Sequence, residues 1–165
     1  MTDVKTLYDT DTAAWSEQQA AALRAAARGG SNQPLDWENL AEEIEDLAKS
    51  LRRRLRSQVA RIIQRQVKLE YSPIIDPRSG WRRTIRLARL DIGRILEDSP
   101  SLKREISRLI EKETAGAVQL AILDLEEHGE IDQMEPPAIR KTSYTEQQVL
   151  GDWFPEESAA QHKRD

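Results

Sequence analysis

Residues 36–71 read DWENLAEEIEDLAKSLRRRLRSQVARIIQRQVKLEY, and this stretch decides the fold. Its large apolar residues recur at steps of three and four, at Trp37, Leu40, Ile44, Leu47, Leu51, Leu55 and Ile62. At 100° per residue they form one narrow stripe, which is the pattern of an amphipathic α-helix. No Gly or Pro interrupts the run. We therefore predict one helix over about 36–71, roughly 54 Å long, which needs other helices packed along it.

Signals for further helices lie on both sides of this segment. A cluster of capping residues at 9–12 precedes an Ala-rich helix that ends at Arg28, before Gly29 and Gly30. Asp76-Pro77 begins a third helix, with a core stripe at Trp81, Ile85, Ala88, Ile92 and Ile95. Ser99-Pro100 begins a fourth, with core positions at Leu102, Ile106, Leu109, Ala117 and Leu120.

The C-terminal part of the sequence predicts less regular structure. Residues 130–142 contain two prolines and indicate an irregular connector. Thr145 to Gln148 has the spacing of a capping box and predicts a short helix, after which Trp153 and Phe154 pack against the bundle. The predicted fold is all-α, a helical bundle built around one long helix, with about four main helices and a short C-terminal helix.

Length and composition indicate how the chain is organised. We expect one helical domain over 1–155 and a disordered tail over 156–165. The 165 residues include no Cys, which excludes disulfides and thiolate chemistry and fits a reducing compartment. No apolar run approaches the roughly 20 residues of a membrane-spanning helix. We expect a cytoplasmic protein that binds no membrane.

Five blocks carry a resemblance to a known family. They are Tyr8-Asp-Thr-Asp11 with Trp15, Asp36 to Leu47, Trp81-Arg-Arg-Thr-Ile85, Ser99-Pro-Ser-Leu102, and Tyr144 to Leu150 with Phe154-Pro155. Over about Tyr8 to Glu156 the chain resembles the bacterial domain-of-unknown-function family numbered twenty-nine. The resemblance implies a small helical protein and brings no activity or catalytic residue with it. Where relatives tend to carry a His before the Lys, this chain reads Gln64-Arg-Gln-Val-Lys68.

Charge is arranged in blocks along the chain. Residues 49–94 carry 14 basic side chains against three acidic ones, whereas residues 1–48 carry three basic and ten acidic ones. An acidic first half and a basic second half of the long helix would complement each other in an antiparallel pair. We therefore expect a homo-oligomer, with an antiparallel dimer favoured, and place Leu87 and Leu90 at its apolar centre. Such a protein would be a non-enzymatic protein-interaction or oligomerising module, open to other protein partners.

Rows of basic side chains offer an alternative function, nucleic-acid or phosphate binding. The candidate binding residues are Arg54, Arg61, Arg65, Lys68, Arg82, Arg86 and Arg89. The formal net charge of −4 and the absence of a recognised binding motif argue against nucleic acid as a partner.

A third alternative is a metal-dependent nucleotide hydrolase. Glu42 and Glu45 have the Glu-x-x-Glu spacing with which helices hold Mg²⁺. A second carboxylate pair would have to come from the region of Asp124, Glu126 and Glu127, whose spacing is ordinary. We therefore expect no cofactor, and the sequence defines no catalytic residue.

Overall fold

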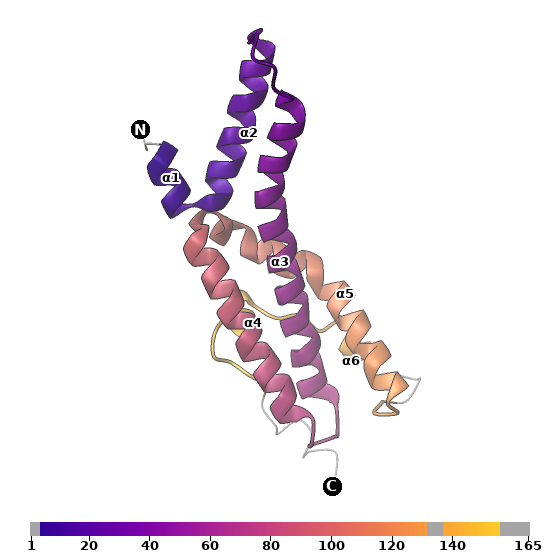
Figure 1. Cartoon of the computed structure of the whole chain (residues 1–165). Coiled ribbons are helices and arrows are strands. Elements are labelled where there is room, and N and C mark those ends of the chain that lie inside the picture. Colours follow the sequence, from indigo (N-terminus) through magenta and orange to yellow (C-terminus); the bar gives the residue numbers. More distant parts are fainter. Residues whose placement is uncertain (1–3, 132–136, 156–165) are drawn as a thin grey trace. The chain divides into compact units, whose positions relative to one another are not determined.

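The computed structural model describes residues 4–131 and 137–155. Its helices follow in the order α1 (Val4–Thr10), α2 (Thr12–Arg28), α3 (Trp37–Tyr71), α4 (Arg78–Asp98), the 3₁₀-helix η1 (Pro100–Glu105), α5 (Ile106–Glu127), α6 (Pro137–Arg140) and α7 (Glu146–Leu150) (Figure 1). The described residues form no strand, so the predicted all-α class is confirmed. The predicted long helix is confirmed over 35 residues. The expected tail at 156–165 lies outside the described residues.

The chain divides into two compact units. The first comprises Met1–Leu55 and Gly93–Arg104, and the second comprises Arg56–Ile92 and Glu105–Asp165. The boundaries fall within α3 and within α4, so each of these helices contributes to both units. Within the described residues, no helix combines the length and the apolar character that crossing a bilayer requires.

In the first unit, α2 and the first half of α3 form an antiparallel hairpin (Figure 1). Arg24 bonds Glu38 at 3.2 Å and Glu45 at 3.3 Å, and Arg52 bonds Glu17 at 2.7 Å. These contacts fix the register of the two helices. Between them lie buried alanines on both sides, at Ala13, Ala20, Ala41 and Ala48. Such small side chains let two helix backbones approach closely.

The buried alanines show that part of the predicted core stripe of α3 was wrong. Leu40 and Leu47 were expected to be buried, but they are 40% and 46% exposed. The prediction was wrong because α2 packs onto Ala41 and Ala48, which lie about 100° around the helix from the two leucines. Leu55 is buried, as predicted.

Asp11 organises two helix starts in the first unit. It is the N-cap of α2, with Oδ1 accepting from the N–H of Ala14 at 2.9 Å. It also accepts from Ser101, while the Ser99 hydroxyl accepts from the N–H of Ala13 at 3.1 Å. The predicted fourth helix begins as the tighter η1, and the Ser99 side chain caps α2 instead of its own helix. The separate helix α1 was not predicted.

The second half of α3 is central to the second unit and contacts two long helices (Figure 1). Gln58 donates to Asp91 of α4 at 2.8 Å, and Gln64 donates to Asp124 of α5 at 2.9 Å. The predicted core residues Ile62 and Ile85 are fully buried. Leu120, also predicted to be buried, is 53% exposed, because α5 turns the neighbouring Ala121 and Ile122 toward the core.

The ends of the helices in the second unit are fixed by specific groups. Arg78 is buried and donates to the carbonyls of Leu69, Ser72 and Ile74, which closes the C-terminus of α3. The capping box predicted at Thr145 and Gln148 is confirmed. The connector predicted to be irregular contains the short helix α6, whose Ile139 is fully buried.

Candidate functional site

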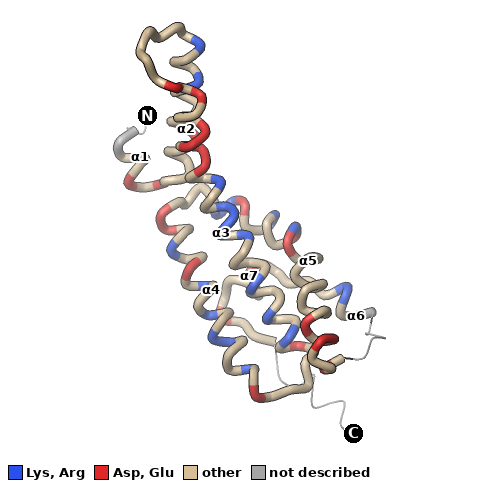
Figure 2. The backbone as a smooth tube through the Cα atoms, turned by 45° about the vertical axis from the view of Figure 1, so that its right-hand side comes forward, with Lys and Arg blue, Asp and Glu red and all other residues tan. Residues whose placement is uncertain are grey.

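The predicted basic residues fall into three structural groups. Arg54 and Arg61 are exposed, whereas Arg65 is half-buried and Lys68 is buried. The other three, Arg82, Arg86 and Arg89 of α4, gather on the C-terminal segment. Figure 2 shows basic residues along the second half of α3 and along α4, and acidic residues along the first half of α3. Because Arg54 belongs to the first unit and the other six belong to the second, the seven residues do not form one surface of one unit.

Three arginines of α4 surround the ring of Phe154. The guanidinium carbons of Arg82, Arg86 and Arg89 lie 5.8, 5.3 and 4.9 Å from its centroid. A cation over an aromatic face is attracted by the ring quadrupole, by about 0.5–1 kcal/mol at exposed sites. These three arginines, which were candidates for phosphate binding, therefore contact a segment of the same chain.

Arg89 makes the most extensive of these contacts. Its guanidinium donates to the carbonyls of Val149 at 2.8 Å, Gln148 at 2.9 Å and Trp153 at 2.7 Å. Burial, together with the nearby charge of Arg86, lowers the pKa of Arg89, while Asp152 acts in the opposite direction. The side chain thus satisfies the carbonyls at the end of α7, which makes it a structural residue.

Lys68 lies at a buried junction of three helices. Its ammonium group is 3.3 Å from Asp124 of α5 and 5.0 Å from the ring centroid of Trp81 of α4. Gln64 donates to the same carboxylate oxygen. Both lone-pair directions of that oxygen are therefore used inside the protein. This arrangement joins α3, α4 and α5 and leaves Lys68 little access to an external ligand.

The candidate metal ligands are not brought together. Glu45 bonds Arg24 and Lys49, and the bond to Arg24 is the main cause that lowers the pKa of Glu45. Glu42 is exposed. Among the described residues, no group of three or more His, Asp or Glu side chains lies in an arrangement that could hold a metal ion.

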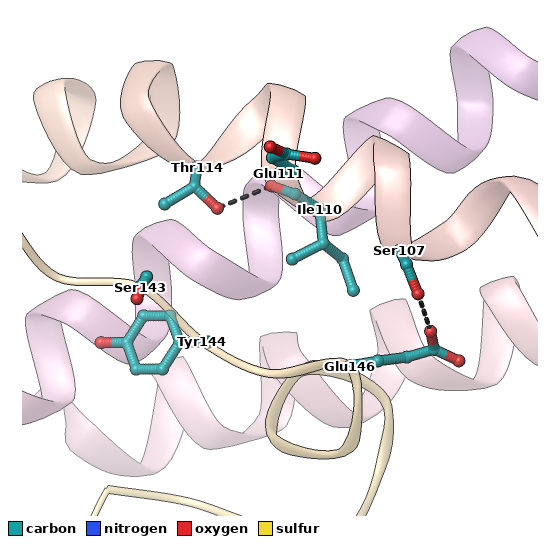
Figure 3. Close-up of a pocket in the computed structure, with 7 residues that line it drawn as sticks. All are labelled: Ser107, Ile110, Glu111, Thr114, Ser143, Tyr144 and Glu146. Atoms are coloured by element: carbon teal, nitrogen blue, oxygen red, sulfur yellow. Dashed lines mark hydrogen bonds between the residues drawn. The ribbon is translucent and has the colours of Figure 1, made fainter.

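Two cavities adjoin Tyr144 in the second unit. One, of about 310 Å³, is lined by residues of α5 and by the segment 143–146 (Figure 3). Figure 3 shows hydrogen bonds among some of its lining residues, with Ser107 donating to Glu146 and Thr114 donating to the carbonyl of Ile110. The other cavity, of about 460 Å³, is bordered by Glu70 and Tyr71.

A carboxylate and two tyrosines contribute to the polar lining of the larger cavity. The hydroxyl of Tyr144 donates to Glu70 at 2.7 Å, and the hydroxyl of Tyr71 bonds Thr142 at 2.8 Å. Burial, followed by the charge of Glu70, raises the pKa of Tyr144. This group was missed in the sequence, because nothing local to Glu70 indicates a partner 74 residues away.

An unfilled apolar stripe remains on the first half of α3. It consists of the exposed Leu40 and Leu47 and the half-buried Trp37, Ile44 and Leu51, and we call it the open stripe. The steps of three and four between these residues are those of a coiled-coil seam. The sequence identified these residues correctly as a stripe. However, α2 packs beside the stripe, on Ala41 and Ala48, and does not cover the stripe itself.

Comparison with known proteins places the chain in a family. A family model described as "Domain of unknown function DUF29" matches residues 7–154. An α-helical protein of unknown function from Rhodospirillum rubrum, solved by crystallography, is similar in structure with a TM-score of 0.69 and 25% sequence identity, covering 94% of this chain and 96% of that one. No curated protein matches the chain. The match spans nearly all the described residues, and the protein therefore belongs to the DUF29 family.

Proposed function

We propose that this protein is a non-enzymatic homodimerising module in which the open stripe of α3 pairs with the open stripe of a second copy. The observation that carries the proposal is the exposure of Leu40 and Leu47 beside the half-buried Ile44 and Leu51. A helical hairpin with such a seam buries it by packing against a second hairpin, which gives a four-helix bundle. The absence of Cys supports the cytoplasm as its location.

Antiparallel pairing fits the spacing of the stripe. If Ile44 lies opposite Leu47 of the second copy, two-fold symmetry sets Leu47 opposite Ile44. The same register sets Leu40 opposite Leu51, and it sets Trp37 opposite Arg54, where a cation–π contact can form. Every apolar residue of the stripe then has a partner.

The charges of the same segment favour this direction. Between Trp37 and Arg54, five acidic residues precede Leu47, at Glu38, Glu42, Glu43, Glu45 and Asp46, and four basic residues follow it, at Lys49, Arg52, Arg53 and Arg54. Antiparallel pairing opposes acidic to basic residues, whereas parallel pairing opposes like charges. Charge matching of this kind selects the orientation more than it raises the affinity.

Sedimentation velocity at about 10–100 µM tests the proposal. We expect a dimer for the natural protein and a monomer for the double variant Leu40→Glu/Leu47→Glu, with unchanged circular dichroism because both side chains are exposed. The matched control is Ile74→Glu/Ile75→Glu, which changes two exposed apolar residues away from the stripe and should leave the dimer intact. A natural protein that is monomeric throughout this range would overturn the proposal.

A second pair of variants tests the direction of pairing. In the proposed register Ser50 lies beside Glu43 of the second copy. Ser50→Lys should then tighten the dimer and Ser50→Glu should weaken it. With two symmetry-related contacts of roughly 0.2–1 kcal/mol each, the dissociation constants should differ about tenfold. Both variants lose the same hydroxyl, which accepts from Arg53 at 2.9 Å, so that loss cancels in the comparison.

A further inference from the structure

The second unit carries an exposed face formed by α3, α4 and α5. At 100° per residue, Arg61 lies about 60° from Gln58, which contacts α4, and about 60° from Gln64, which contacts α5. Arg61 is exposed, so it marks the solvent-facing ridge of α3 between its two neighbours.

Pairs of exposed leucines flank this ridge on both neighbours. On α4, Asp91 accepts from Gln58 and so marks the side of the helix that faces α3. Leu87 lies about 40° around the helix from Asp91, and Leu90 lies a further 60° around; both are exposed. On α5, Leu120 has the same relation to Asp124, and Leu123 is exposed beyond it. The four leucines are 49–59% exposed. We call the surface made by Arg61, Leu87, Leu90, Leu120 and Leu123 the three-helix face.

Acidic groups at the borders of this face are already bonded. Asp91 accepts from Gln58, Glu113 accepts from Arg56 at 2.7 Å, and Asp124 accepts from Lys68. These three carboxylates therefore already have hydrogen-bond partners other than Arg61, which lies nearer the centre of the face.

Arg61 and two arginines one helical turn from residues of the face, Arg65 on α3 and Arg83 on α4, have no such partner. Among the residues that the structure describes, no ion pair joins Arg61, Arg65 or Arg83 to a carboxylate, and the contact of Arg61 with Gln58 is long, at 3.5 Å. The Nε of Arg65 is buried without a hydrogen-bond acceptor. A buried donor without an acceptor is costly, by about 1–3 kcal/mol. The face thus combines uncovered leucines with positive charge.

We propose that the three-helix face binds an acidic amphipathic helix of a partner protein. Leucine or a similar residue at i, i+3 and i+7 of that helix would pack against the leucine pairs, and neighbouring carboxylates of the helix would meet Arg61, Arg65 and Arg83. The charge complementarity decides the class of partner, because a basic or neutral helix would leave the arginines unpaired. This surface is distinct from the open stripe and belongs to the other unit.

Fluorescence anisotropy with two designed peptides tests the proposal. One is a labelled helical peptide of about 18 residues with leucines on one face and glutamates elsewhere, and the other has lysines in place of the glutamates. We expect the natural protein to bind the acidic peptide at least about tenfold more tightly than the basic one. Equal binding of both peptides, or of neither at millimolar concentration, would overturn the proposal.

Variants locate the binding. Arg61→Glu and Leu87→Ser/Leu120→Ser should each weaken the acidic peptide at least about tenfold, and because these side chains are exposed the fold should persist by circular dichroism. Arg108→Glu and Leu35→Ser change exposed residues elsewhere and should leave binding unchanged. Binding reduced equally by the control variants would contradict the assignment. If phosphatidylglycerol vesicles bind through the face and the acidic peptide does not, the ligand of the face is a membrane. That result would overturn the proposal of a protein partner.

Discussion

The carboxylate of Asp11 accepts two hydrogen bonds from Ser101, which lies 90 residues further along the chain. One comes from the backbone N–H at 2.6 Å and the other from the hydroxyl at 2.9 Å. The same carboxylate caps α2 through Ala14. A single side chain therefore satisfies donors at the start of α2 and in the first turn of η1.

Replacement of Asp11 should reduce the free energy of unfolding substantially. A lost N-cap costs about 1 kcal/mol, and hydrogen bonds to a charged group contribute about 1.5–3 kcal/mol. We expect Asp11→Ala to lose about 2–4 kcal/mol and Asp11→Asn to lose less, since Asn keeps one acceptor oxygen. Urea unfolding followed by circular dichroism measures this, with the exposed Asp9→Ala as control. Equal stability of the Asp11 and Asp9 variants would refute the shared cap.

Arg89 should be far more sensitive to substitution than Arg86. Lysine retains the charge but cannot place donors on three separate carbonyls, so Arg89→Lys should lose about 2–3 kcal/mol. Arg86→Lys keeps its cation near Phe154 and should change stability by less than about 0.5 kcal/mol. Chemical unfolding monitored by tryptophan fluorescence compares the two. Similar losses in both would show that Arg89 does not hold the end of α7.

The pair formed by Lys68 and Asp124 should show energetic coupling. Asp124→Ala leaves a buried ammonium group without its carboxylate and should cost about 3 kcal/mol. In the Lys68→Met background the same change should cost much less, because no buried charge is left unpaired. A double-mutant cycle from urea unfolding measures the difference. Additive effects would indicate that the ion pair contributes nothing beyond its separate side chains.

Tyr144 should make the protein less stable at high pH. Its pKa is raised in the folded state, so the hydroxyl remains protonated while an unfolded tyrosine ionises near pH 10. Above that pH the unfolded chain binds fewer protons, and stability falls by about 1.4 kcal/mol per pH unit for this group. Below pH 10 the contribution is fully present.

Comparison with Tyr144→Phe isolates this effect. The variant lacks the ionisable hydroxyl and its bond to Glu70, so it should be less stable than the natural protein at pH 8. At pH 11 its disadvantage should shrink or reverse, because only the natural protein loses stability through this residue. Unfolding midpoints at the two pH values measure this, and a constant difference would exclude the role assigned to Tyr144.

Local signals determined much of the fold from the sequence. The caps at Asp36 and Thr145 act within three residues of themselves, and the structure shows both, with Asp36 accepting from the N–H of Asn39 at 3.3 Å. The long helix follows from apolar spacing without Gly or Pro, and the all-α class follows from repeating that pattern. Helix capping and periodicity are properties of neighbouring residues, so the sequence contains them directly.

Tertiary structure alone decided which surfaces these helices bury. The apolar stripe of α3 contains both leucines and adjacent alanines, and only the close approach of α2 selects Ala41 and Ala48 and leaves Leu40 and Leu47 exposed. The positions of the α4 arginines were evident in sequence, but their role depends on Phe154, which the fold brings to them from the far end of the chain. Partners so distant in sequence are set by packing, because no periodic pattern relates them.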